Sequence, residues 1–141
     1  MSDGNRSCLG PFLLVIGVVA AGYFLFSKGY LARFSNVNSE LQRVSVEINK
    51  TTPKLLDEYT RLDSTTVERD RTIAFNLTII NFAGKDLPPQ AATLLRNRNL
   101  AEYRSNPRMK AVRDAGITVR FRYHSQFGVP LMEFTVGPKD L

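Results

Sequence analysis

The sequence is short of the residue types that build disulfide frameworks and metal centres. Its 141 residues include one cysteine, one histidine and no tryptophan. A single cysteine excludes an internal disulfide and any site with several cysteine ligands. One histidine beside that cysteine does not supply the ligand set of a zinc enzyme. We therefore expect no metal and no cofactor.

Catalytic motifs are missing as well. The chain has no glycine-rich phosphate loop, no Gly-x-Ser-x-Gly and no His-Glu-x-x-His. His124 falls on the polar side of a predicted strand, and Asp57, Glu58 and Asp63 flank Arg61, which is typical of surface charge balancing. We assign no catalytic residue and predict that the protein is not an enzyme.

Charge is absent from residues 7–27, which contain the apolar run 9–26. As a helix those 18 residues span about 27 Å, close to a hydrocarbon core of about 30 Å. The pattern predicts a short tail over 1–8, a transmembrane helix over 9–27 with the lipid bilayer as its partner, and a linker over 28–37.

A cleaved signal peptide is the alternative to an anchor, because Val19-Ala20-Ala21 offers the small residues of a cleavage site. The apolar run continues to Phe26, which favours an uncleaved signal anchor. Gly17 and Ala21 form a small-xxx-small pair that would allow helix association and a homo-oligomer.

The orientation of the anchor has two readings. Lys28 and Arg33 follow the span and Arg6 precedes it, so the basic count places the C-terminal side in the cytoplasm. A very short N-terminus before a whole folded domain is the usual layout of a bacterial signal anchor. We expect a single-pass protein of the cell inner membrane with a periplasmic domain over 38–141.

Residues 38–141 predict an α+β domain that begins with a helix. Ser39 and Gln42 have the form of a capping box, and apolar residues recur at helical spacing up to Ile48. Proline disfavours helix at the residue before it, so Pro53 limits this helix.

Strict alternation of apolar and polar residues predicts strands with one buried face. The alternation is clear in 71–80 and in 117–124. We expect 71–80 to form a hairpin with 59–67, and 117–124 to form one with 131–136. The buried positions are Ile73, Phe75, Leu77, Ile79, Ile117, Val119, Phe121 and Tyr123.

Helical segments separate the two hairpins. Pro88 and Pro89 are placed for a helix start, Pro107 begins a shorter helix, and Gly116 ends it. The predicted domain is therefore a two-layer α+β fold, ordered helix, β-hairpin, helices, β-hairpin, with a four-stranded antiparallel sheet covered by the helices.

The basic residues gather in the window 96–122. This window contains eight lysines or arginines, and its only acidic residues are Glu102 and Asp114. Its net charge of +6 equals the charge of the whole chain. The eight basic residues form a candidate basic interaction face made of Arg96, Arg98, Arg104, Arg108, Lys110, Arg113, Arg120 and Arg122.

Three readings of this face remain open. It is a solvated surface, or it contacts anionic lipid headgroups or an acidic protein partner, or it binds nucleic acid. The last reading is the least favoured, because Phe121 and Tyr123 face the predicted core and cannot stack on bases.

Short segments resemble a known class of proteins. Thr60-Arg-Leu-Asp-Ser64, Asp114-Ala-Gly-Ile-Thr118 and Phe121-Arg-Tyr123 look like parts of small membrane-anchored bacterial envelope proteins of unassigned role, over about residues 45–137. The element order also resembles cystatin-like or NTF2-like domains. The Gln-x-Val-x-Gly loop of cystatins is absent, since Gln126-Phe-Gly-Val129 does not match it.

The sequence therefore predicts a non-enzymatic single-pass membrane protein that presents a small extracytoplasmic interaction domain, as a structural or assembly component of the envelope. The alternative is a membrane-tethered cystatin-like or NTF2-like domain that binds a small ligand or acts as an enzyme. It would need polar residues on the inner strand faces, which are nearly all apolar in the chain.

Overall fold

The computed structural model describes residues 37–82 and 84–141. The predicted tail 1–8, the predicted transmembrane helix 9–27 and all but the last residue of the predicted linker 28–37 lie outside this part. Within the described residues no helix has the length and apolarity needed to cross a membrane.

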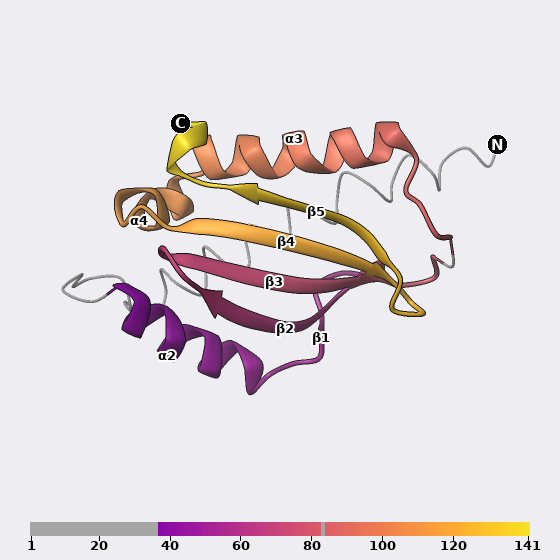
Figure 1. The fold of residues 1–141 in the computed structure, drawn as a ribbon, viewed down its shortest axis with the longest axis horizontal. Helices are drawn as coiled ribbons and strands as arrows, with labels where there is room; N and C mark the ends of the chain where they lie inside the picture. Colours follow the sequence, from indigo (N-terminus) through magenta and orange to yellow (C-terminus); the bar gives the residue numbers. More distant parts are fainter. Residues whose placement is uncertain (1–36, 83) are drawn as a thin grey trace.

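The described chain forms one sheet with helices packed along it (Figure 1). The elements in chain order are α2 Val37–Asn49, β1 Lys54–Leu55, β2 Thr60–Glu68, β3 Thr72–Ile79, α3 Pro89–Ser105, η1 Pro107–Met109, α4 Lys110–Asp114, β4 Thr118–Ser125, β5 Pro130–Val136 and η2 Pro138–Asp140. The predicted α+β class and order of main elements are confirmed.

The sheet differs from the predicted four antiparallel strands. It has five strands in the order β1-β2-β3-β4-β5, and β3 pairs with β4 in parallel while the other pairs are antiparallel. The parallel pair arises because α3 carries the chain back along the sheet, so that β4 starts at the same end as β3 (Figure 1). The fifth strand, β1, has two residues and no alternation to reveal it.

Both long helices cover the same face of the sheet. The hydroxyl of Thr65 in β2 forms a hydrogen bond with Ser45 of α2. The sheet register places Thr65 opposite Phe75, and the same row continues through Phe121 to Phe134. Side chains of paired residues share a face, so this row runs beneath the helices. The Phe121 and Phe134 rings stack with centroids 5.2 Å apart.

The predicted core positions are buried. Ile73, Leu77 and Ile117 are fully enclosed, and their neighbours at alternate positions in β3 and β4 are buried with them. In β3 the other face is largely buried too, at Thr72, Ala74 and Thr78. Long side chains from the two flanking strands cover this second face, since Arg61 of β2 reaches the Thr78 hydroxyl and Arg120 of β4 lies opposite Ala74.

The helix boundaries follow local chemistry at most points. Pro89 occupies the first turn of α3, as predicted, and Gly116 adopts a φ of +68° directly after α4. The described part of α2 already begins at Val37, so Ser39 lies inside the helix and the predicted capping box is wrong.

Candidate functional site: distribution of the basic residues

The predicted basic face does not gather on one element. Three of its arginines, Arg96, Arg98 and Arg104, lie on α3 with exposed side chains. Arg108 belongs to η1, and its side chain lies outside the described part. The remaining four residues lie on α4 and β4.

The arginines of α3 point to different sides of the helix. Leu95, Asn99 and Tyr103 form its buried stripe. With about 100° of rotation per residue, Arg96 and Arg98 are separated by about 160° around the helix axis. Neither has an acidic partner among the described residues, and the two flank the exposed surface of α3 on opposite sides.

The two basic residues of α4 are engaged locally. The Lys110 ammonium pairs with the Asp114 carboxylate. The Arg113 guanidinium donates to the backbone oxygens of Tyr103 at 2.8 Å and Asn106 at 2.9 Å. These oxygens lie at the C-terminal end of α3, where carbonyls lack helical partners, so Arg113 has a structural role.

Arg120 and Arg122 lie on the sheet face that α2 and α3 leave uncovered. Arg120 is 2.9 Å from a Glu68 oxygen and 3.7 Å from Glu133, and Arg122 contacts the same two carboxylates. Burial lowers the pKa of Arg122, but hydrogen bonds and charge from Glu68 and Glu133 outweigh it and raise the pKa overall. Two cations and two anions balance, so this network joins β2, β4 and β5 without leaving net charge.

Two of the acidic residues near β2 accept hydrogen bonds within the domain. An Asp57 oxygen accepts the backbone N–H of Tyr59 at 2.6 Å and of Thr60 at 2.8 Å. Asp63 pairs with Arg61 and accepts from Thr78. Within 37–82 and 84–141 no group of His, Cys, Asp and Glu side chains could hold a metal ion.

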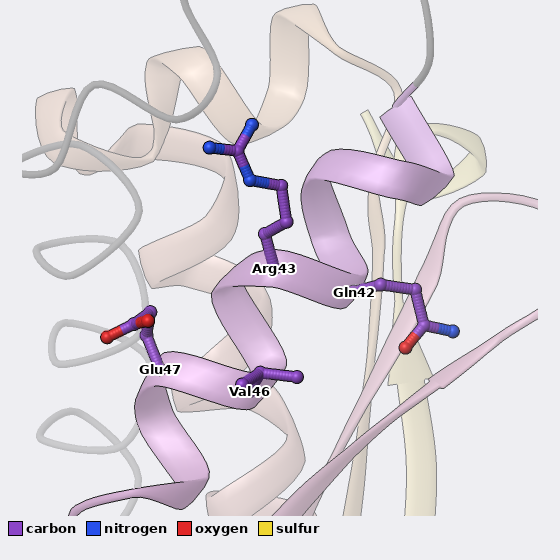
Figure 2. A pocket seen from close by; sticks show the side chains of 4 residues that line it. All are labelled: Gln42, Arg43, Val46 and Glu47. Atoms are coloured by element: carbon purple, nitrogen blue, oxygen red, sulfur yellow. The ribbon is translucent and has the colours of Figure 1, made fainter.

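A shallow hollow runs along the outer side of α2, lined by Gln42, Arg43, Val46 and Glu47 (Figure 2). Arg43 pairs with Glu40 at 3.1 Å, and Glu47 pairs with Lys50 at 2.9 Å. Val46 remains 54% exposed. The hollow therefore offers an apolar contact between side chains whose charges are already paired.

A second hollow lies on the outer side of α3, lined by Pro89, Gln90, Thr93, Leu94 and Asn97. Leu94 is 42% exposed and supplies its larger apolar surface. Arg98 follows one residue after this lining, so an apolar contact and an unpaired cation are neighbours on the helix.

A family model described as a domain of unknown function (DUF8479) matches residues 36–129. The chain belongs to this family. The match covers α2 through β4 and thus includes most of the residues that build the DUF8479 sheet. The comparison with curated proteins finds no match.

Solved structures share the fold of this DUF8479 protein. It resembles EpsS, a pilotin of the Vibrio vulnificus type 2 secretion system, at 10% identity and a TM-score of 0.59, covering 74% of this chain and 90% of EpsS. It resembles AspS, the type II secretion system pilotin of Vibrio cholerae, at 13% identity and a TM-score of 0.57, covering 75% of this chain and 93% of AspS. A Pseudomonas aeruginosa protein described as secreted is 14% identical with a TM-score of 0.51, and the match covers 74% of this chain and 91% of that protein.

These matches correct three predictions. The three solved structures are two secretion-system pilotins and a protein described as secreted. The predicted function as a single-pass envelope component, the predicted class of signal-anchored membrane proteins and the predicted inner-membrane location are contradicted by them. All three depend on the apolar segment 9–27, which lies outside the described residues.

The sequence reading also missed two features of the folded domain. It did not pair Arg120 and Arg122 with Glu68 and Glu133, although the hairpin register places Glu133 opposite Arg122. It placed Tyr123 on an apolar face, although a buried phenol needs a hydrogen-bond partner.

Proposed function

We propose that this DUF8479 protein is a non-enzymatic, protein-binding component of a bacterial secretion apparatus, with a role related to that of pilotins. The observation that carries the proposal is the shared fold, which extends over 90% of EpsS and 93% of AspS. Both are named for a place in a secretion system and not for a reaction.

We further propose that α3 supplies the contact surface. Of the predicted basic face, Lys110, Arg113, Arg120 and Arg122 already satisfy groups within the domain. Arg96 and Arg98 of α3 have no such commitment among the described residues, whereas Arg104 donates to the Asp140 carbonyl. Charge complementarity therefore favours an acidic segment of a protein partner, which would meet Arg98 beside Leu94.

Crosslinking in the cells of origin tests the proposal. The protein carries an affinity tag, neighbours are captured by a short crosslinker, and mass spectrometry identifies them. We expect subunits of a secretion system to be enriched over an untagged control. A neighbour list without any such subunit contradicts the proposed role.

The contact surface has a matched test. The double variant Arg96→Gln/Arg98→Gln removes two positive charges from α3, and Lys54→Gln/Lys139→Gln removes two from other exposed positions. We expect the first pair to reduce capture about tenfold and the second to leave it within about twofold, since about 1.4 kcal/mol corresponds to a tenfold change. Equal losses would reject the α3 surface while leaving the secretion role intact.

A further inference from the structure

The turn between β4 and β5 begins an apolar run that the fold leaves uncovered. Residues 127–132 read Phe-Gly-Val-Pro-Leu-Met and contain no polar side chain. None of these six residues is buried. Phe127 is 71% exposed, which makes it the most exposed large apolar residue in the described part of the chain. Single exposed apolar side chains are ordinary on protein surfaces, whereas contiguous apolar stretches mark interaction sites. We call residues 127–132 the apolar tip.

A β-bulge lies within the apolar tip, where it enters β5. Pro130 lies opposite His124 and Met132 lies opposite Tyr123, so Leu131 is an extra residue between the two pairs. A bulge interrupts the regular alternation of side chains along a strand. Leu131 and Met132 both remain partly exposed, although they follow each other in the chain. The apolar surface therefore continues from the turn along the first part of β5, which is an edge strand.

Ser125 fixes the shape of the apolar tip. This serine is 1% exposed, and its Oγ accepts the backbone N–H groups of Phe127 and Val129, both at 3.2 Å. Its carbonyl accepts the N–H of Gly128 at 2.9 Å. Gly128 has a φ of +80°, which residues with a Cβ rarely adopt. The exposed ring of Phe127 is thus carried by a turn that is held by its own hydrogen bonds.

Each backbone N–H from residue 126 to residue 129 is bonded within the domain. The N–H of Gln126 donates to the Phe82 carbonyl at 3.3 Å, and the next three N–H groups donate to Ser125. Residue 130 is a proline and has no N–H. The side chain of Gln126 is engaged too, because its Oε1 accepts the N–H of Asn81 at 3.1 Å. Residues 126–130 therefore hold no backbone donor that would need a new partner on leaving water.

These properties fit a lipid surface better than a protein groove. An apolar medium cannot supply hydrogen bonds, so a segment that enters it must satisfy its own backbone donors. A protein partner can pair with free backbone groups, as in strand addition, but residues 126–130 offer no free N–H for such pairing. Residues 125–132 also carry no charge, and the flanking titratable residues are His124 and Glu133. No charged group has to leave water together with the tip.

We propose that the apolar tip is a membrane-contact site that enters the interfacial layer of a lipid bilayer. Phe127 enters with the turn, and the apolar residues after it follow as far as the first charged residue of β5, Glu133. Burial of apolar surface drives the contact and requires no directional bond. The inference is independent of the proposed secretion role and of the acidic partner proposed for α3.

The absence of tryptophan from the chain provides a direct test, because one introduced tryptophan is a unique fluorescent reporter. Phe127→Trp places it in the apolar tip. Leu141→Trp is the matched control, since Leu141 is 64% exposed and the C-terminus lies at the opposite end of the molecule from the β4–β5 turn (Figure 1). Both full-length variants are mixed with phosphatidylcholine vesicles. We expect the emission maximum to shift to shorter wavelength for Phe127→Trp and to stay unchanged for Leu141→Trp.

Vesicles of phosphatidylcholine brominated in its acyl chains extend this test, because the bromine atoms quench tryptophan on contact. We expect quenching at position 127 and none at position 141. Equal responses at the two positions, or no response at position 127, would overturn the proposal. A shift that requires anionic lipid and disappears at high salt would also overturn it, because exposed cations would then make the contact. A shift that only an added protein produces would assign the tip to a protein partner instead.

A charge placed in the tip gives a second comparison, with Val129→Trp as the reporter. Val129→Trp/Phe127→Asp adds a carboxylate two residues from the reporter, and Val129→Trp/Leu141→Asp adds one at the opposite end of the molecule. A charged side chain is costly to place in lipid, so we expect the first variant to lose the emission shift and the second to keep it. Phe127 and Leu141 are both exposed, so neither substitution disturbs the core. Equal shifts in the two variants would reject the membrane contact.

Discussion

At the scale of single residues, the side chain of Asn49 closes part of the free edge of β2. Its Oδ1 accepts the N–H of Thr65 at 2.7 Å, and its Nδ2 donates to the Thr65 oxygen at 3.0 Å. The amide thus replaces a neighbouring strand at a point where β1 no longer reaches. Unpaired strand edges invite association with other chains, so this contact also protects the fold.

Replacing Asn49 with leucine is expected to lower the free energy of unfolding by about 1–3 kcal/mol, because it leaves the backbone N–H of Thr65 without a partner. The Thr65 oxygen keeps the hydroxyl of Ser45 as a donor, at 3.2 Å. Urea denaturation measures the change. Gln42→Leu, at an exposed position of the same helix, is the control and should stay within about 0.5 kcal/mol. Equal effects of the two substitutions would contradict the role of Asn49.

Tyr103 makes stability depend on alkaline pH. Burial raises its pKa from 10.0 to about 12, an effect that Arg113 partly offsets and Asp140 strengthens. Below pH 10 the phenol is neutral in both the folded and unfolded states, so its contribution is complete. Between pH 10 and 12 only the unfolded chain ionises, and stability is lost as the pH rises.

Urea denaturation between pH 9 and 11.5 should therefore show a falling free energy of unfolding. One tyrosine held neutral contributes up to about 1.4 kcal/mol per pH unit. Tyr123, whose pKa is also raised by burial, adds to the fall. In Tyr103→Phe the free energy of unfolding should fall less steeply with pH, by the amount that corresponds to about one proton. An unchanged slope would contradict the assignment.

At the scale of elements, β4 joins the sheet through its two faces. Phe121 and Tyr123 pack against Phe134 on the inner face, with ring centroids 5.2 and 6.4 Å apart. On the outer face Arg120 and Arg122 reach Glu68 in β2 and Glu133 in β5. Strand β4 is therefore joined to β5 by apolar contacts on the inner face, and to β2 and β5 by ion pairs on the outer face.

The substitution Arg122→Met should cost about 1 kcal/mol in the free energy of unfolding. The pairs are partly exposed and therefore weaker than buried ones, but they form a network. High salt should reduce the difference between variant and unmodified protein. Arg98→Met, at an exposed position of α3, is the control with an expected change within about 0.5 kcal/mol. A variant as stable as this control would show that the network contributes nothing.

At the scale of the whole molecule, the sheet is built around β3 and β4. They are adjacent inner strands and hold most of the buried apolar residues of the sheet, whereas β1 has two exposed residues. Global unfolding is required to separate such strands, while edges open locally. The parallel pair of β3 and β4 is thus expected to be the most persistent part of the fold.

Hydrogen exchange followed by mass spectrometry tests this order of stability. Peptides covering 72–79 and 118–125 should exchange slowest, and peptides covering 54–55 and 138–140 should exchange within the earliest time points. Peptides of α3 should fall between them, because this helix buries only Leu95, Asn99 and Tyr103. Protection of α3 beyond that of β3 would contradict a sheet-centred core.

Periodicity predicted the strands β3 and β4 and their buried residues, because alternation is a local property of each segment. The strands β2 and β5 were predicted as their hairpin partners. Proline and glycine likewise marked the start of α3 and the end of α4. The spatial arrangement was not accessible in this way. The direction in which a long crossover returns the chain is set by how α3 packs, so the parallel pairing of β3 with β4 was missed.

The basic window shows the same limit for the candidate site. Composition identified its eight cations and their net charge of +6, and charge is indeed a property that the sequence by itself determines. Which of them are available depends on neighbours far away in the chain. Glu68 and Arg122 are 54 residues apart, yet they meet across the sheet. Only the tertiary structure decided that the arginines of β4 form ion pairs within the domain while those of α3 remain exposed. Ion pairing depends on distance in space and not on separation along the chain.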